Sequence, residues 1–286
     1  MQRAYLTMTA LKRQMTTANN TAEFLTRGRK IIYAASAALE KWTTRRFDPY
    51  VATVRHDPRL KRHDGDIVEY TLCPRGDLME LTTLINGDGT TLIVDTDVEI
   101  IRDTSRVTNN ITGIELVNEL LNWEHNTSSR RKASIQLTGT WGYGYNVNDT
   151  GVVIGSTLND SDTTVPTSGS YSFEQDQLLQ VGNEIMRVTA DATVTGVSSI
   201  GVERAYNGST AASHALNDAI YIISFHPLVD RFMKRIAAWF DAQDASPLFG
   251  QVVLGDVAIP VDITKMPNDV QAMVETLKPL SSIKGT

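Results

Sequence analysis

A first set of residues that could do chemistry combines histidine and carboxylate side chains. His56 and His63 stand near Asp64 and Asp66, a mixture of imidazole and carboxylate that could bind a metal ion. Their spacing matches no standard metal motif, and a polar loop between two strands explains it better. The sequence therefore predicts no metal and no other cofactor.

The other reactive side chains stand alone. His214 lies among small residues in a predicted loop, where a general base is conceivable but has no evident partner. Cys73 is the single cysteine, which excludes an internal disulfide framework and a cysteine-based zinc site. We interpret it as a small buried apolar residue. The sequence also lacks the common nucleotide-binding, nucleophile-elbow and zinc-protease motifs, so we predict that the chain is not an enzyme.

Charge is distributed unevenly along the chain. Residues 1–62 contain 13 Lys and Arg against 4 Asp and Glu, although the whole chain has a net charge of −6. This asymmetry indicates different neighbours on different sides of the molecule, although a solvated helix face is the alternative. Because the chain is acidic overall, we favour an acidic protein surface over DNA phosphates as the partner of these cations. The candidate partner-binding residues are Arg27, Arg29, Lys30, Lys41, Arg45 and Arg46.

Helical periodicity is confined to the two ends of the chain. Apolar residues recur at three- and four-residue steps in 22–42, and again after Pro227 and after Pro267. Neither end has enough apolar faces to pair by itself, so we expect the N- and C-terminal helices to pack together. The predicted fold class is α+β, a discontinuous helical bundle with a β-rich excursion and an inserted small β domain.

The middle of the chain is predicted to be β. Alternating β-branched and aromatic residues mark strands, and Asn86-Gly87-Asp88-Gly89 is a strong turn signal between two of them. Residues 113–123 could form either a helix or a strand. The later part of the middle is rich in Asn, Asp, Thr, Ser and Gly, and its acidic residues far outnumber its two basic ones. The predicted domains are a helical core (1–48 plus 225–286), its β-rich segment (49–145) and the inserted β domain (146–224).

Phrases in this order resemble the head–tail connector (adaptor) proteins of long-tailed bacteriophages. Thr44-Arg45-Arg46-Phe47 stands where the first long helix of that family ends in a Thr-Gly-Arg phrase, with Arg45 in place of the usual glycine. The other phrases that resemble the family are Asp77–Leu81, Asn86–Gly89, Thr138–Tyr143, Pro227–Asp241 and Pro267–Val270. The resemblance covers residues 5–145 and 225–280.

Residues 146–225 depart from that pattern, because simpler members of the family continue directly into the closing helix. Glu184–Val188 followed by Val202–His214 resembles a β module scattered through phage virion proteins. This resemblance makes Arg204 and His214 parts of a recurring fold rather than a catalytic pair.

The resemblance implies a structural protein of the virion neck, assembled in the cytoplasm of the host bacterium. Its relatives form a ring, generally of twelve subunits, beneath the portal and continue the DNA channel towards the tail. The implied partners are the portal protein, neighbouring copies and the next neck or tail protein, with no sequence-specific DNA binding and no membrane. The C-terminal segment of relatives reaches towards the portal, which adds Ser281, Ser282, Ile283 and Lys284 to the candidate partner-binding residues.

Two alternatives stay open. One is another neck component, such as a stopper or tail-completion protein, whose subunits tend to be dominated by a β-barrel; the predicted helical ends oppose it. The other is a virion glycan-binding or hydrolytic protein, in which the insert would be the active part. Tyr143 and Tyr145 beside Trp141 could form a sugar-stacking face.

Overall fold

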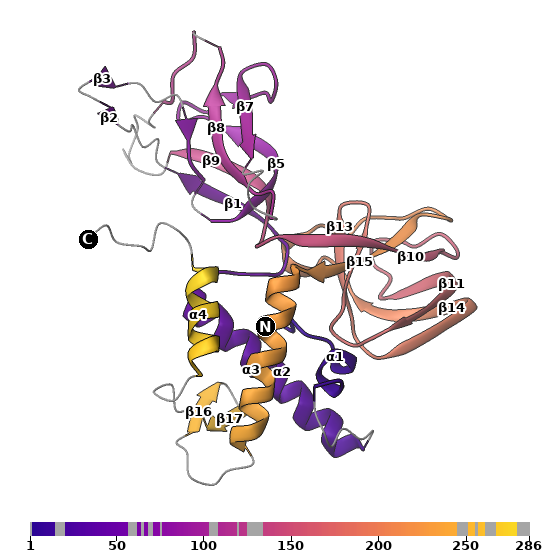
Figure 1. The fold of residues 1–286 in the computed structure, drawn as a ribbon. Helices are drawn as coiled ribbons and strands as arrows, with labels where there is room; N and C mark the ends of the chain where they lie inside the picture. The colour runs from indigo at the N-terminus through magenta and orange to yellow at the C-terminus, as the bar shows by residue number, and fades with distance from the viewer. Residues whose placement is uncertain are drawn as a thin grey trace. The chain divides into compact units, whose positions relative to one another are not determined.

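The structure is a computed structural model of the chain, and it forms two compact units (Figure 1). The first unit comprises Met1–Phe47 and Asn146–Thr286, and the second comprises Asp48–Tyr145. The residues described are 2–14, 21–56, 62–63, 66–67, 71–74, 76–102, 108–118, 120–124, 134–244, 251–254, 257–260 and 267–278.

Helices from both ends of the chain meet in the first unit. They are α1 (Met8–Lys12), α2 (Ala22–Thr43), α3 (Pro227–Asp244) and α4 (Asn268–Leu277), accompanied by a hairpin of β16 (Gln251–Leu254) and β17 (Val257–Pro260). The Thr21 hydroxyl caps α2 by accepting a hydrogen bond from the backbone N–H of Phe24 at 3.2 Å. Trp42 of α2 contacts Trp239 and Phe240 of α3, with ring centroids 6.3 and 6.4 Å apart. The two ends of the chain therefore share an aromatic core.

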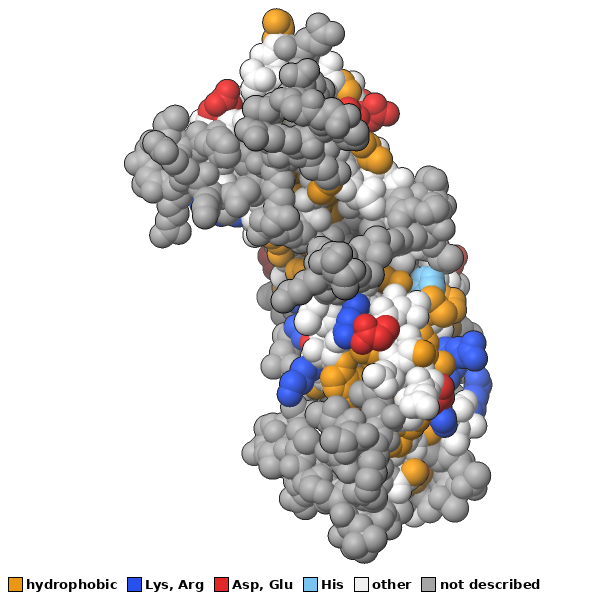
Figure 2. All heavy atoms as spheres, turned by 60° about the vertical axis from the view of Figure 1, so that its left-hand side comes forward, with side chains coloured by type: hydrophobic (Ala, Val, Ile, Leu, Met, Phe, Trp, Pro, Cys, Tyr) orange, Lys and Arg blue, Asp and Glu red, His pale blue; other side chains and the backbone are white. Residues whose placement is uncertain are grey.

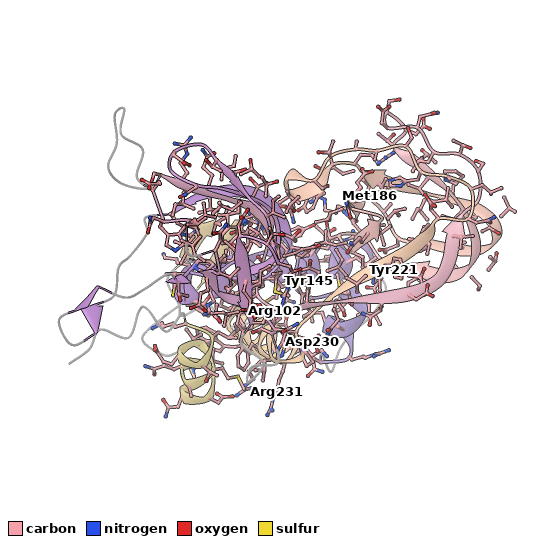
Figure 3. All side chains as sticks on the ribbon, turned by 90° about the horizontal axis from the view of Figure 1, so that it is seen from above. Arg102, Tyr145, Met186, Tyr221, Asp230 and Arg231 are labelled. Carbon is pink, nitrogen blue, oxygen red and sulfur yellow. The ribbon has the colours of Figure 1, made fainter. Side chains whose placement is uncertain are left out.

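A closed barrel of six strands completes the first unit. In order around the barrel, the strands are β10 (Tyr145–Ile154), β11 (Thr164–Phe173), β14 (Ala192–Glu203), β13 (Glu184–Val188), β12 (Leu178–Val181) and β15 (Ala219–Phe225). A 3₁₀ turn, η1 (Tyr206–Gly208), follows β14. Alternate residues point inward, so Val165, Phe173 and Met186 are buried in the barrel core, and Figure 3 labels Met186 on β13.

The second unit is built on a seven-stranded antiparallel sheet. The main strands, in sheet order, are β1 (Tyr50–His56), β9 (Ile135–Trp141), β5 (Leu78–Ile85), β8 (Ile111–Leu116) and β4 (Thr71–Leu72). β6 (Thr91–Leu92) pairs with β5, and β7 (Val98–Arg102) pairs with β8. A separate hairpin consists of β2 (Arg62–His63) and β3 (Asp66–Ile67). Trp141 is buried in the core of the sheet, where its indole N–H donates to the carbonyl of Ala52 at 3.0 Å.

The predicted turn at Asn86–Gly89 is confirmed, and it joins β5 to β6. The Asn86 amide does more than turn the chain, because it donates to the carbonyl of Asn122 at 2.8 Å and accepts from the backbone N–H of Glu124 at 2.9 Å. The carbonyl of Glu124 comes so close that a Cβ added at Gly87 would lie 1.9 Å from it. Glycine is therefore required at this position for the close approach of two backbone segments.

The predicted fold class, an α+β fold centred on a helical bundle, is wrong. The structure is mostly β, with 41% strand against 26% helix, and it contains the closed barrel and the half-barrel sheet. Residues 113–123 were predicted to form either a helix or a strand, and the first of them belong to strand β8. The division into three domains stays a prediction.

The physical reason for this error lies in the outward faces of the barrel strands. β11 and β14 form a ladder of ten pairs, from Thr164 opposite Gly201 to Phe173 opposite Ala192. The exposed residues of this ladder are largely Ser and Thr. Strand sequences rich in Ser and Thr are easily taken for loops, because they show little hydrophobic alternation. A helix, in contrast, shows its hydrophobic periodicity within one segment of the sequence.

Candidate functional site

The predicted basic cluster is divided among different neighbours rather than gathered on one surface. An Arg27 Nη2 atom lies 2.7 Å from Oδ1 of Asp241 on α3. The guanidinium of Arg29 points instead to the barrel, where its Nη2 lies 3.5 Å from Oδ2 of Asp191. On the face shown in Figure 2, the Lys and Arg side chains likewise form several separate groups. Arg27 and Arg29 are thus engaged within the first unit.

Lys30 and Lys41 are two further candidates that α2 presents to solvent. Both are exposed, and neither forms an ion pair with a described residue. Eleven residues complete about three helical turns, so the two lysines lie on the same side of α2, about 16 Å apart along its axis. Arg45 and Arg46 are half-buried just after the helix. The predicted tail residues, Ser281, Ser282, Ile283 and Lys284, lie outside the described residues.

Polar contacts join the barrel to the N-terminal helices. The Tyr33 hydroxyl of α2 donates to Oδ2 of Asp176 at 2.6 Å, and the backbone N–H of Thr9 donates to Oε2 of Glu174 at 2.9 Å. Burial, followed by the hydrogen bond with Asp176, raises the pKa of Tyr33 above its ordinary value. Tyr33 therefore remains a neutral hydrogen-bond donor at physiological pH.

A groove of about 400 Å³ lies at this junction between the N-terminal segment and the barrel. Its lining includes Tyr5, Leu6, Tyr171, Ile222, Phe225 and Asp230. Figure 3 labels Asp230 on α3, where its carboxylate lies 2.5 Å from Nζ of Lys234. Among the described residues that line the groove, none is a histidine or a cysteine.

The barrel contains a buried acid–base cluster centred on Glu184, whose side chain is 0% exposed. Arg204 donates to both carboxylate oxygens through Nε and Nη2, each at 2.7 Å, and Nε2 of His214 lies 2.9 Å from Oε2. The backbone N–H groups of Ala205 and Ala212 also donate to the carboxylate, each at 3.1 Å. Burial alone raises the pKa of Glu184, but the hydrogen bonds from Arg204, His214 and the backbone outweigh it and lower the pKa to about 2.

This cluster ties loops together rather than exposing a reactive group. Arg204 also donates to the carbonyl oxygens of Asn159, Asp162 and Ala212 at 2.8, 2.9 and 2.6 Å. With five donors on one carboxylate and no solvent access, Glu184 cannot reach a substrate. The resemblance to a β module placed Arg204 and His214 in one predicted phrase, but the carboxylate that they share is visible only in the folded barrel.

The depressed pKa of Glu184 predicts a loss of stability in acid. The pKa is about 2 in the folded chain against an ordinary value of 4.5, so the stabilisation is complete above pH 4.5 and is lost as the pH falls towards 2. The full loss is about 3 kcal/mol in the free energy of unfolding. Calorimetric melts of the wild type and of Glu184→Gln between pH 6 and pH 2.5 measure it. The variant should lose less stability than the wild type across this range; equal slopes would contradict the prediction.

The remaining candidates show no reactive arrangement. His56 is buried and stacks on Trp141, with ring centroids 5.9 Å apart. His63 and Asp66 lie in the β2–β3 hairpin. Asp64 lies outside the described residues. Within the described ranges, no group of three or more His, Cys, Asp or Glu residues is placed to hold a metal ion. Because Trp141 is buried, it offers no ring face to a sugar.

The interpretation of Cys73 as a buried residue is wrong. Its side chain is exposed just beyond the end of β4. Alternation along the chain buries Leu72 and turns the next residue, Cys73, outward. Cys73 therefore plays no part in the core of the sheet.

Comparison of the chain with protein-family models, with curated proteins and with solved structures found no match. Among the described residues, no helix has both the length and the apolar character needed to cross a membrane.

Proposed function

We propose that the chain is a structural subunit of the neck of a long-tailed bacteriophage, a head–tail connector that forms a ring beneath the portal. The observation that carries the proposal is the meeting of Trp42 with Trp239 and Phe240. Helical segments from the two ends of the chain lie together there, and the β parts occupy the sequence between them. The phrases that resemble the connector family follow the same order along the sequence: helix, strands, helix.

The distribution of polar groups supports a role in binding rather than in catalysis. The most elaborate acid–base cluster, around Glu184, is fully buried and saturated with hydrogen bonds. Lys30 and Lys41, by contrast, are exposed on one side of a long helix. Exposed cations on a rigid helix suit recognition of an acidic protein surface.

A stopper or tail-completion protein is the second candidate, and the barrel favours it. Such subunits tend to be dominated by a β-barrel, and strand exceeds helix in this chain. The helical ends that oppose this candidate are present in the structure, but strand outweighs them. The two candidates differ in their immediate partner, since a connector binds the portal itself and a stopper binds a portal already occupied by a connector.

Sedimentation with purified portal rings of the same phage tests the proposal. A connector should co-sediment with bare portal, and electron micrographs should show an added ring with a single symmetry axis. Binding only to connector-loaded portal would replace the connector role with the stopper role. Failure to bind either assembly would contradict a role in the neck.

A further inference from the structure

The groove between the N-terminal segment and the barrel lies at the rim of the barrel. Its volume is about 400 Å³, within the range of small-molecule sites, about 300–1,000 Å³. The end of β11, the start of β12 and the end of β15 meet there. Tyr171 and Ile222 line the groove and also pack against the barrel core. The mouth of a β-barrel is a common place for a ligand site.

The charges of the groove exclude an anionic ligand. Asp176 and Asp230 are the only charged residues among the described residues that line it. Both carboxylates already have a partner, since Asp176 accepts from the hydroxyl of Tyr33 at 2.6 Å and Asp230 lies 2.5 Å from Nζ of Lys234. A phosphate or an acidic peptide would meet like charges there. The lining therefore suits a neutral ligand.

Neutral polar side chains make up the rest of the polar lining. They are Thr7, Asn148, Tyr171, Gln175, Gln177 and Ser224. The hydroxyl of Tyr171 and the side-chain amide of Gln175 form no hydrogen bond with a described residue. Oε1 of Gln177 accepts from the backbone N–H of Glu174 at 2.9 Å, which leaves its N–H₂ group to donate elsewhere. Amides and hydroxyls both donate and accept, so this lining matches a ligand that does the same.

The ring of Tyr171 adds an apolar surface beside these polar groups. The residue is half-buried, and its ring centroid lies 4.8 Å from that of Phe173, which is buried in the barrel core. Phe173 thus holds the ring in place while part of it stays accessible. Ile222 and Phe225, also half-buried, extend the apolar surface of the groove. Such a surface suits a ligand with one apolar face and hydroxyl groups around its edge.

We propose that this groove binds a neutral saccharide of one or two rings. The C–H face of the sugar stacks on Tyr171, and its hydroxyl groups exchange hydrogen bonds with the amides of Gln175 and Gln177. A purely apolar ligand of the same size would bury these amides without partners, which is unfavourable. Saccharide binding is a second activity of the chain, and it does not depend on the neck function.

Saturation-transfer difference NMR of the full chain with a panel of neutral sugars tests the site. The panel contains glucose, galactose, mannose, rhamnose, N-acetylglucosamine, maltose and lactose. At about 1 mM, at least one sugar should receive saturation, most strongly at the C–H protons of the face that stacks on the tyrosine. Inorganic phosphate should not displace it, because the groove contains carboxylates and no cation among its described lining residues.

Variants with matched controls place the sugar in the groove. Gln175→Ala and, separately, Tyr171→Ala should each weaken binding about tenfold. Tyr171→Phe should weaken it less, because the stacking ring remains. Tyr221→Ala on β15, a position that Figure 3 labels, and Gln180→Ala on β12 lie outside the lining and should leave binding unchanged. Circular dichroism checks that every variant is folded, and Gln175→Ala keeps the test decisive if Tyr171→Ala unfolds.

Two results would overturn the saccharide site: no sugar of the panel binds at about 10 mM, or the groove variants bind sugar as the wild type does. A proline-rich peptide is tested in parallel, because grooves lined by aromatic residues also take such segments. Binding of the peptide and of no sugar would replace the saccharide with an extended peptide. The portal experiment contains no sugar, so the neck function and the saccharide site stand or fall separately.

Discussion

Replacing Glu184 with Gln should lower the free energy of unfolding by about 3–5 kcal/mol, because it leaves a buried arginine without its counter-charge. The Arg204 side chain is 6% exposed and donates to both oxygens of the carboxylate. A glutamine offers one acceptor oxygen and places an amide N–H₂ group against the remaining donors of the cluster. The substitution therefore removes a negative charge and also places hydrogen-bond donors against one another in the barrel core.

Chemical denaturation followed by far-ultraviolet circular dichroism measures this loss, and hydrogen exchange of the β13 and β14 amides localises it to the barrel. Glu203→Gln is the matched control, because Glu203 is 38% exposed and its ion pair with Arg187 lies near the surface. Exposed pairs contribute about 0–1 kcal/mol. If the two variants are equally stable, the Glu184 cluster does not hold the barrel together.

Replacing Tyr5 with Ala should cost about 3–5 kcal/mol, as expected for removing a large buried ring. Tyr5 is 1% exposed, and its ring contacts Phe47 and Phe225 edge-on, with centroids 5.6 and 5.1 Å away. Its backbone N–H donates to Oγ of Ser36 at 3.1 Å, and its hydroxyl donates to Glu40. One side chain thus packs where the segment after α2 and the end of β15 come together.

Tyr5→Phe separates the ring from the hydroxyl. The phenylalanine keeps the two aromatic contacts and loses the hydrogen bond to Glu40 and the one that the hydroxyl accepts from the backbone N–H of Phe47 at 3.4 Å, so it should cost about 1–3 kcal/mol. Guanidinium unfolding followed by tryptophan fluorescence measures the loss; Trp42 and Trp239 report on this unit, and Trp123 and Trp141 report on the other. A Tyr5→Ala variant no less stable than Tyr5→Phe would show that the ring is not central to this junction.

The features that could be predicted from the sequence depend on contacts between residues close together in the chain. Thr21 caps α2 through a residue three positions away, and the turn at Asn86–Gly89 closes within five residues. Helix periodicity repeats every few residues, so one segment displays its own signal. The beginnings of α2 and α3 and the β5–β6 turn were accordingly predictable.

The barrel was not predictable in this way because its strands pair across long separations. Thr164 pairs with Gly201, and Leu178 of β12 pairs with Ile223 of β15. Strands with exposed Ser and Thr show little hydrophobic alternation, so the amount of strand was underestimated. Closure of the sheet and burial of Glu184 between Arg204 and His214 depend on the complete register.

The sequence by itself determined that cations concentrate near the N-terminus and that acidic residues dominate the remainder of the chain. Only the tertiary structure decided which cations remain available, because an ion pair depends on which distant carboxylate lies within a few ångströms. Arg27 meets Asp241 and Arg29 meets Asp191, whereas Lys30 is exposed and forms no ion pair with a described residue. The difference arises because adjacent helical positions point about 100° apart, so neighbours in sequence face different parts of the fold.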